Sequence, residues 1–256
     1  MTFTSAIVLG GVGGIGKEIC VQLIGKGLKN LAVIDVVDDV TVTTALEAEF
    51  KNVNFLYKKC SVTDESELRK CMTAIKDEFE WVDVIVNSVG VLDEASPKRT
   101  IDINYGGVVN STIIGIDLMR KDNGMRGGCI VNIASITALG SHFWLPVYAG
   151  SKHAVLGFTR SLINDAFFEK TGIKFMSICP GVTNTPLVNF ERHFANILFP
   201  EMVDEVKSLG GSFARQEVDI VGRCVIAALE DGENGSTWQC ENGRIEKLNL
   251  VEYPKF

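Results

Sequence analysis

The chain has 256 residues, 46% of them hydrophobic and 22% charged, which is enough for one α/β domain with a well-buried core. The net charge is −7 and no basic run is present, so nucleic acid is not expected as a partner. No stretch reaches the ~20 apolar residues of a membrane span, and the apolar N-terminus lacks the basic region of a signal peptide. These features predict a soluble, cytoplasmic protein without a membrane span.

The seven cysteines are scattered, odd in number and without CxxC spacing. This pattern predicts reduced thiols that fill the core, and neither a disulfide framework nor a zinc site. The three histidines, His142, His153 and His193, are too dispersed to indicate a metal site. We therefore expect no bound metal.

The first elements along the chain are an apolar run over residues 6–9, a glycine-rich stretch over 10–16, a helical pattern, and a second strand over 28–35 that ends at Asp35. Glycines permit a tight turn and let the backbone approach a pyrophosphate, and a helix N-terminus favours phosphate. An acid about 20 residues further on can hold a ribose diol. A glycine-rich turn without a ligand is the alternative, but the flanking strands and Asp35 favour dinucleotide binding.

The rest of the chain continues this alternation of strands and helices. Helical patterns cover 41–50, 65–79, 96–119, 148–168 and 219–229, and apolar strands cover 54–57, 82–87, 129–135 and 174–179, with one or two short strands at 235–240 and 245–248. Asn104 and the Gly106–Gly107 pair interrupt the long helical pattern. Such alternation predicts a doubly wound parallel sheet with helices on both faces, a Rossmann-type α/β fold. No linker or repeat divides the chain, so we predict a single domain over 1–256.

Residues 186–215 lack clear periodicity and contain four phenylalanines: Phe190, Phe194, Phe199 and Phe213. A lid over an apolar substrate explains this composition better than a cofactor-binding aromatic cluster. His142 and Trp144 precede the helical pattern that contains Tyr148. They fit the lining of a substrate pocket and loop packing about equally well.

Polar residues follow the predicted strands where they end, at Asp35, Asn87, Ser135 and Pro180–Gly181. Ligands bind at the carboxyl ends of the strands in such sheets, so we expect these residues to share one rim. Tyr148 and Lys152 stand four residues apart and would share one face of a helix. A nearby cation lowers the pKa of a phenol, so the two could form a proton-transfer pair. Chance spacing, with a packed tyrosine and a snorkelling lysine, is the alternative.

The ordered motifs resemble those of the short-chain dehydrogenase/reductase family over nearly the whole chain, to about residue 190. The matching positions are Gly10, Gly14 and Gly16; Asn87–Gly90; Asn104; Ser135; Tyr148 and Lys152; and Pro180–Thr185. Within the family, residues 28–31, 91–93, 99–101, 146–148 and 235–238 are most similar to the insect alcohol dehydrogenases and their fat-body relatives. Residues 151–153, 157–161 and 178–181 are similar to 15-hydroxyprostaglandin dehydrogenase, which comes second.

The resemblance implies a catalytic set of Asn104, Ser135, Tyr148 and Lys152. Tyr148 would transfer the proton, Lys152 would lower the tyrosine pKa and hold the nicotinamide ribose, Ser135 would hold the substrate oxygen, and Asn104 would anchor a water. The implied cofactor contacts are Gly10, Gly14, Ile15, Gly16, Asp35, Ser61, Val62, Asn87, Gly90, Tyr148, Lys152, Pro180, Gly181, Val182 and Thr185. Three positions depart from the family pattern: Leu9 replaces a threonine, Ser61 an aspartate and Ser88 an asparagine.

These observations predict an NAD-dependent dehydrogenase of a secondary or medium-chain alcohol or a hydroxy-lipid. NAD is preferred to NADP because Asp35 would repel a 2′-phosphate, and no cation follows Asp35 before Lys51. The alternative is a catalytically silent fat-body or developmental relative that keeps the fold and binds a ligand. Apolar residues around the helices at 100–119 and 148–168 predict a homodimer.

Overall fold

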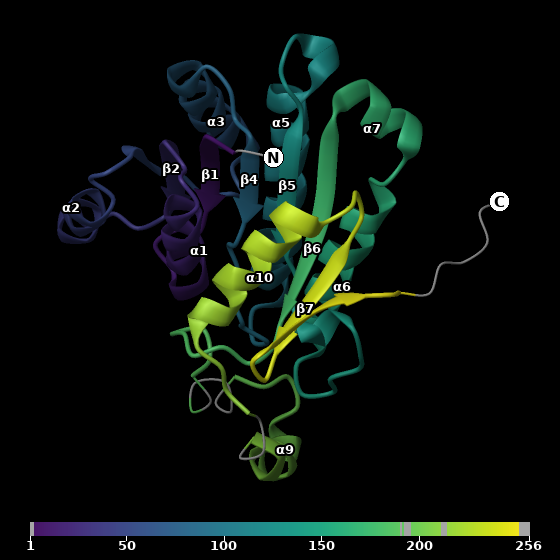
Figure 1. Ribbon diagram of the computed structural model, residues 1–256. Coiled ribbons are helices and arrows are strands. Elements are labelled where there is room, and N and C mark those ends of the chain that lie inside the picture. Colours follow the sequence, from purple (N-terminus) through teal and green to yellow (C-terminus); the bar gives the residue numbers. More distant parts are fainter. Residues whose placement is uncertain (1–2, 190, 192–195, 211–213, 251–256) are drawn as a thin grey trace.

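One eight-stranded sheet organises the computed structural model, which describes residues 3–189, 191, 196–210 and 214–250. The strand order is β3-β2-β1-β4-β5-β6-β7-β8, and only the last pair is antiparallel (Figure 1). The strands are β1 (Ser5–Leu9), β2 (Asn30–Asp35), β3 (Asn54–Lys59), β4 (Val84–Asn87), β5 (Gly128–Ile133), β6 (Ile173–Pro180), β7 (Thr237–Glu241) and β8 (Arg244–Leu248). The predicted doubly wound α/β fold is therefore confirmed.

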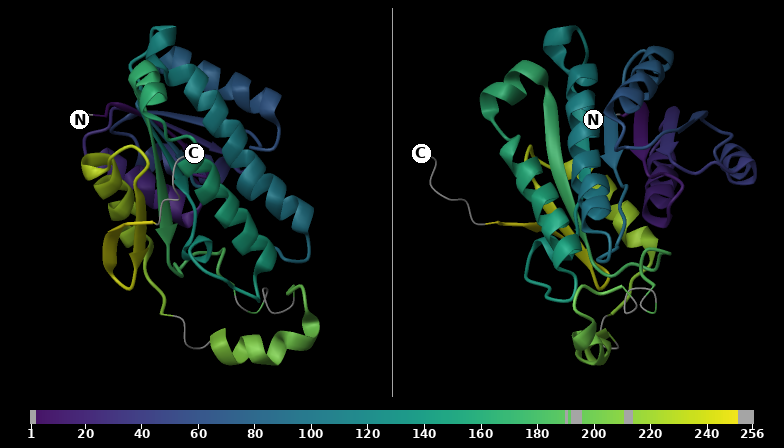
Figure 2. Two further views of the ribbon diagram at one scale, coloured as in Figure 1. Left: turned by 90° about the vertical axis from the view of Figure 1, so that its right-hand side faces the viewer. Right: turned by 180° about the vertical axis from the view of Figure 1, so that it is seen from behind.

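Both faces of the sheet are covered, because successive strand residues point to opposite sides. In β1, Ala6 and Val8 pack with α1 (Gly14–Gly25), α2 (Val40–Glu49) and α10 (Val218–Asp231). Ile7 and Leu9 pack on the other side with α3 (Glu65–Phe79) and α5 (Gly107–Met119), and α6 (Pro146–Ser161) also lies on that side (Figure 2). The apolar strand runs thus serve two cores at once, and all seven cysteines are free thiols, six of them buried.

The long predicted helix at 96–119 changes geometry in its middle. It begins as α4 (Pro97–Ile101), passes through a π-helical segment at Asp102–Gly106, and continues as α5. Asn104 lies inside the π-helical segment and is fully buried. Such bulges are frequent at functional sites, because they insert a residue and turn a side chain off the regular helical positions.

The helix predicted over 148–168 is in fact two helices, α6 and α7 (Asp165–Thr171). The sequence prediction was wrong here because Asn164 adopts an extended conformation and its side chain caps α7, accepting a hydrogen bond from the Phe167 amide at 2.9 Å. Asparagine competes with helix continuation in this way. The two short C-terminal strands form a hairpin, whose turn residues Asn242 and Gly243 both have positive φ.

The described part of the predicted lid lies below the carboxyl edge of the sheet (Figure 1). It contains a 3₁₀ turn at Pro200–Met202 and α9 (Val203–Gly210). Phe199 is 48% exposed, whereas Phe190, His193, Phe194 and Phe213 lie outside the described residues. Among the helices that are described, none is long and apolar enough to cross a membrane.

Candidate active site

A cavity of about 450 Å³ opens at the carboxyl ends of the parallel strands. It is formed by the glycine turn after β1, the loops that follow β4, β5 and β6, the first turns of α6, and part of the predicted lid. Twelve of the predicted site residues line it: Gly10, Gly14, Ile15, Gly16, Gly90, Ser135, Tyr148, Lys152, Pro180, Gly181, Val182 and Thr185. Five do not: Asp35, Ser61, Val62, Asn87 and Asn104.

The glycine turn forms one wall of the cavity. Gly10 has φ +80°, and a Cβ on Gly16 would lie 2.1 Å from the Gly10 carbonyl oxygen, so both positions require glycine. The N-cap of α1, Gly13, has no side chain to bond the first-turn amides, and no acidic residue stands in that turn. This wall therefore offers bare backbone and an uncompensated helix N-terminus, which suits the pyrophosphate of a dinucleotide.

Asp35 lies beyond the cavity at the end of β2. Its carboxylate accepts hydrogen bonds from the amides of Val12 at 3.2 Å and Val36 at 2.8 Å. The neighbouring strand places Lys59 opposite Asp35, where Lys59 pairs with Asp38 at 2.5 Å. A count of cations along the sequence misses Lys59, because only strand pairing brings it to this edge.

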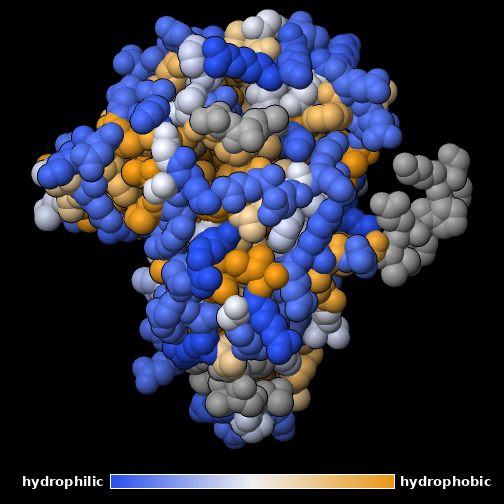
Figure 3. All heavy atoms as spheres, viewed as in Figure 1, coloured by the Kyte–Doolittle hydropathy of each residue, from blue (hydrophilic) through white to orange (hydrophobic). Residues whose placement is uncertain are grey.

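The end of the site near Asp35 also carries exposed apolar side chains. Val36 and Val40 are 62% and 80% exposed, and apolar side chains gather beside α2 in the space-filling view (Figure 3). On the adjacent strand end, Ser61 pairs with the hydroxyl of Thr63 at 2.9 Å. Val62 is held through its carbonyl, which accepts a hydrogen bond from Asn110 at 3.0 Å.

Asn87 does not offer its side chain to the cavity. Its amide nitrogen donates to Asn132 at 2.7 Å and to Thr112 at 3.2 Å, and its oxygen accepts from Ser111 at 2.6 Å. The residue is 2% exposed. The side chain of Asn87 therefore ties β4 to β5 and α5 from beneath the rim, and a contact of Asn87 with the cofactor stays a prediction.

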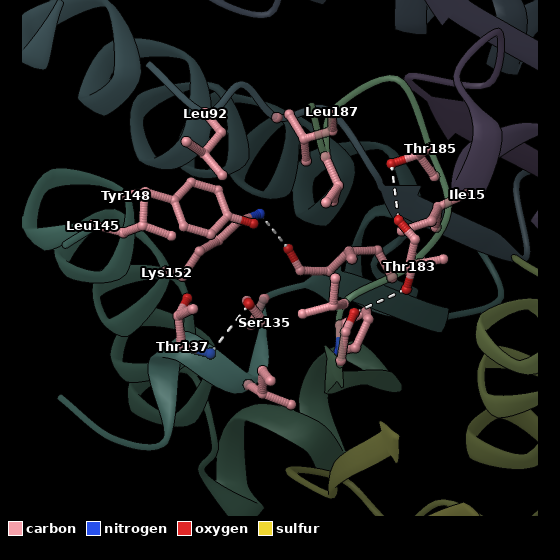
Figure 4. A pocket seen from close by; sticks show the side chains of 18 of the residues that line it. Ile15, Leu92, Ser135, Thr137, Leu145, Tyr148, Lys152, Thr183, Thr185 and Leu187 are labelled. Atoms are coloured by element: carbon pink, nitrogen blue, oxygen red, sulfur yellow. Dashed lines mark hydrogen bonds between the residues drawn. The ribbon is translucent and has the colours of Figure 1, made fainter. Parts of the chain in front are cut away.

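Ser135, Tyr148 and Lys152 point into one space, surrounded by Leu92, Leu145 and Leu187 (Figure 4). The Lys152 ammonium lies 5.8 Å from the centre of the Tyr148 ring and donates a hydrogen bond to the Ile133 carbonyl at 2.8 Å. Ser135 accepts a hydrogen bond from the Thr137 amide at 3.1 Å. His142 and Trp144 also line the cavity. Of the two alternatives for these residues, pocket lining and loop packing, the structure favours pocket lining.

Burial shifts the pKa values of the tyrosine and the lysine in opposite directions. It raises the pKa of Tyr148 to about 12, with a hydrogen bond from Ser135 acting against the rise, and it lowers the pKa of Lys152 to about 8. Loss of water from the phenolate dominates, so the pKa of Tyr148 lies above its ordinary value in this structure. A lowering of this pKa by Lys152 stays a prediction.

Asn104 is held beside this group, but its side chain is committed to the protein. Its oxygen accepts from the Val91 amide at 2.8 Å, and its nitrogen donates to the Val91 carbonyl at 2.9 Å and to Ser151 at 3.0 Å. A Cβ on Gly90 would lie 3.5 Å from the Asn104 oxygen and 3.6 Å from the Lys152 nitrogen. Asn104 thus joins the loop after β4 to α6.

Sequence reasoning missed Glu94, a buried acid that the structure places against the start of α6. No motif marks it, because its partners lie about fifty residues further along the chain. Among the described residues, no group of three or more histidine, cysteine, aspartate or glutamate side chains could hold a metal ion.

The site combines a glycine turn, an acid at the end of a strand and a buried group of a serine, a tyrosine and a lysine. This combination defines a Rossmann-type protein with a site for a nicotinamide cofactor. Residues 4–196 match the family described as short chain dehydrogenase, and the chain belongs to this short-chain dehydrogenase/reductase family of oxidoreductases. The family predicted from the sequence is confirmed.

Two curated relatives are similar over nearly the full length. Alcohol dehydrogenase 1 of Ceratitis cosyra is 32% identical over 97% of this chain and 96% of its own. The NAD(+)-dependent 15-hydroxyprostaglandin dehydrogenase of Rattus norvegicus is 33% identical over 95% of this chain and 90% of its own. Among solved structures, levodione reductase superposes with a TM-score of 0.77 at 25% identity, over 94% of this chain and 96% of that one.

Proposed function

We propose that the chain is an NAD-dependent dehydrogenase that transfers hydride between a secondary or medium-chain alcohol, or a hydroxy-lipid, and NAD. The observation that carries this proposal is the meeting of Ser135, Tyr148 and Lys152 in one cavity, which is continuous with the bare glycine turn. A proton-transfer group and a nucleotide cradle in the same cavity are what alcohol oxidation or carbonyl reduction requires. We propose that 1–256 forms a single domain, in which 186–215 acts as the lid.

The four catalytic residues have separate tasks in this proposal. When bound, the nicotinamide accepts or returns the hydride. Tyr148 exchanges the proton of the substrate oxygen, and Ser135 donates a hydrogen bond to that oxygen as its charge develops. Lys152 supplies positive charge beside Tyr148, and Asn104 links the loop after β4 to α6, the helix that carries both residues.

The pKa of Tyr148 bears on the direction of the reaction. With a pKa of about 12, Tyr148 is a phenol at neutral pH and can donate a proton to a carbonyl substrate. Alcohol oxidation instead needs the phenolate, so its rate should rise with pH. In both reduction and oxidation, the Tyr148 hydroxyl oxygen is the atom that gives or takes the proton.

The proposal of NAD rests on Asp35. A carboxylate accepts hydrogen bonds from both hydroxyls of a ribose and repels a 2′-phosphate. Lys59, the cation opposite, is engaged by Asp38. The name of the rat relative, which specifies NAD(+), supports the same choice.

The proposed substrate class rests on the lining of the cavity. Beside the catalytic group and polar residues such as Thr137 and His142, the lining of the cavity includes Leu92, Trp144, Leu145, Leu187, Val188, Ile197 and Val206. Such a lining favours a hydroxyl carried on an apolar chain, because an extended apolar surface binds through its removal from water.

The test is absorbance at the NADH band with a panel of secondary and medium-chain alcohols and hydroxylated fatty acids. We expect turnover with at least one member and a rate that rises with chain length while the chain fits. Binding of NAD without turnover across the whole panel would contradict the proposal. It would support the alternative, a ligand-binding relative without catalysis.

A further inference from the structure

Glu94 is a buried carboxylate that forms no ion pair within the described residues. It is 2% exposed, and none of the ion pairs formed by the described residues includes it. Its two oxygens accept hydrogen bonds from successive backbone amides, Val147 at 3.0 Å and Tyr148 at 2.8 Å. A buried, unpaired carboxylate is costly to keep, so this placement calls for an explanation.

The amides that Glu94 binds are those that a helix cannot satisfy by itself. The first turn of an α-helix leaves its amide groups without internal partners. The N-cap of α6 is Leu145, which has no side-chain acceptor, and the next residue, Pro146, has no N–H. Glu94 therefore caps α6 from a distant part of the chain, and its charge faces the positive end of the helix.

The segment that carries Glu94 is itself anchored. Asn104 binds both the amide and the carbonyl of Val91, at 2.8 and 2.9 Å. The hydroxyl of Thr100 donates to the Asp93 carbonyl at 2.7 Å. Residues 91–94 thus run as a short, fixed bridge from the π-helical segment to the start of α6.

The π-helical segment itself contacts α6 one turn further on. Asn104 also donates to Ser151 at 3.0 Å, and Ser151 donates to the Tyr148 carbonyl at 2.7 Å. Tyr148 is therefore held at its amide by Glu94 and at its carbonyl by Ser151. Rotation of α6 or its shift along the axis would break the contacts that Glu94 and Asn104 make with this helix.

We infer that Glu94 is a positioning residue, which sets the place of the Tyr148 hydroxyl relative to Ser135 and the cavity by fixing the backbone of Tyr148. This inference rests on the proposed function for its catalytic consequence, but the contacts themselves do not depend on it. Glu94 does not line the cavity, so its effect reaches the reaction only through Tyr148. A displacement near 1 Å at a reacting group can cost about 10²-fold in rate.

The test compares Glu94→Gln with Asp93→Asn. The glutamine keeps the length of the side chain but turns a donor toward one of the two amides. We expect kcat for the best alcohol to fall roughly 10- to 100-fold, while the dissociation constant of NADH, measured by fluorescence, stays within about twofold. Asp93→Asn makes the same chemical change one residue away, where the carboxylate faces Arg99 at 3.5 Å, and should leave both values unchanged.

Hydrogen–deuterium exchange of the peptide that contains Val147 and Tyr148 tests the hydrogen bonds between Glu94 and these two amides without any substrate. Exchange should be faster in Glu94→Gln and unchanged in Asp93→Asn. Unaltered exchange, or unaltered kcat despite faster exchange, would overturn the inference. If the unmutated protein turns over no alcohol, the proposed function fails and exchange alone decides whether Glu94 holds Tyr148. Glu94→Asp, which keeps the charge but shortens the reach, gives the same readouts if Glu94→Gln does not fold.

Discussion

Tyr148 and Lys152 show at the scale of single residues how one apolar cavity acts on two titrating groups. The loss of water favours the neutral form of each, so the phenol pKa rises to about 12 and the ammonium pKa falls to about 8. Lys152 retains a partner in the Ile133 carbonyl, which keeps part of its solvation. Both groups therefore hold a proton at neutral pH, and the cavity contains one net positive charge.

The first prediction concerns the oxygen of Tyr148. Tyr148→Phe keeps the buried ring and removes the hydroxyl that we propose exchanges a proton with the substrate. We expect turnover to fall by at least the ~10²–10⁴ that loss of a general acid–base group causes. NADH binding, followed by fluorescence, should survive because the glycine turn and Asp35 are untouched. Near-full activity of the variant would remove Tyr148 from the mechanism.

A second prediction uses the lowered pKa of Lys152. Below about pH 8 the folded and the unfolded chain both carry the ammonium, so the folded chain bears the whole cost of burying it. As the pH rises from about 8 towards 10.5, the folded chain releases this proton while the unfolded chain keeps it. Stability from this group therefore increases with pH across that window.

The measurement is the free energy of unfolding of the unmutated protein minus that of Lys152→Met. This difference cancels the titration of cysteines and other groups common to both proteins. It should shift in favour of the unmutated protein by about 2 kcal/mol between roughly pH 7 and roughly pH 9.5. A difference that does not change with pH would mean that Lys152 keeps its ordinary pKa in the fold.

The third prediction concerns the acids around the end of β2. Asp35→Asn removes the charge that opposes a 2′-phosphate, so the preference for NAD over NADP should narrow. Adding Asp38→Asn releases Lys59 from its ion pair and should shift the preference further towards NADP. The ratio of kcat/KM for the two cofactors on one good substrate measures both steps.

Glu47→Gln on α2 is the matched control for this series, because it removes an exposed acid near the same edge. The ratio of kcat/KM for NAD and NADP should be the same in this variant as in the unmutated protein. Equal use of NAD and NADP by the unmutated protein would contradict the assignment of Asp35 to the ribose.

At the scale of elements, the strands were predictable because each is a short apolar run buried on both faces. The points at which helices end or change geometry were harder to predict. The pattern at 148–168 stays amphipathic through Asn164, and only the capping bond to Phe167 shows that the chain leaves the helix there. The interruption at Asn104 was visible in the sequence, but its form as a π-helical segment depends on contacts with Val91 and Ser151.

The seating of α5 against the strand ends leads to a fourth prediction. A Cβ on Gly107 would lie 2.4 Å from a methyl group of Val62 and 2.9 Å from its Cβ. Gly107→Ala should therefore push away the turn that follows β3, lower stability by about 1–3 kcal/mol, and weaken NADH binding. Thermal unfolding and fluorescence titration measure the two effects.

Gly25→Ala at the end of α1 is the control, because a Cβ there meets no atom within 4 Å. Alanine is the better helix former, so we expect this variant to be stabilised by up to about 1 kcal/mol with unchanged NADH binding. If both alanines behave alike, close packing at Gly107 does not support the turn at Val62.

At the scale of the whole molecule, the site could be predicted where motif residues lie together in the sequence or at strand ends. What could not be predicted depends on contacts between distant segments. Glu94 meets α6 about fifty residues later, and Lys59 reaches Asp35 only through the pairing of β2 with β3. The internal use of Asn87 likewise follows from neighbours on β5 and α5, which no local pattern reveals.

The surface of α5 and α6 modifies the reasoning behind the predicted homodimer. The prediction rested on apolar residues around these two helices, but four of them, Val108, Ile114, Val155 and Leu156, are buried within the single chain. Their apolar character therefore says nothing about a partner. What remains on the outer side is Ile113, 45% exposed on α5, and the small residues Gly150 and Gly157 on α6, where a Cβ would find open space.

These outer faces still favour association of two copies through α5 and α6, because small residues let helices approach closely and an exposed isoleucine gains from burial. We predict a mass of twice the 27.9 kDa of one chain by light scattering at micromolar concentration. Ile113→Glu should give the mass of one chain, because a carboxylate would be buried without a partner at the contact. Val40→Glu, at the opposite edge of the sheet, should leave the dimer intact. A single-chain mass for the unmutated protein would rule out the dimer, and a dimer that tolerates Ile113→Glu would place the contact elsewhere.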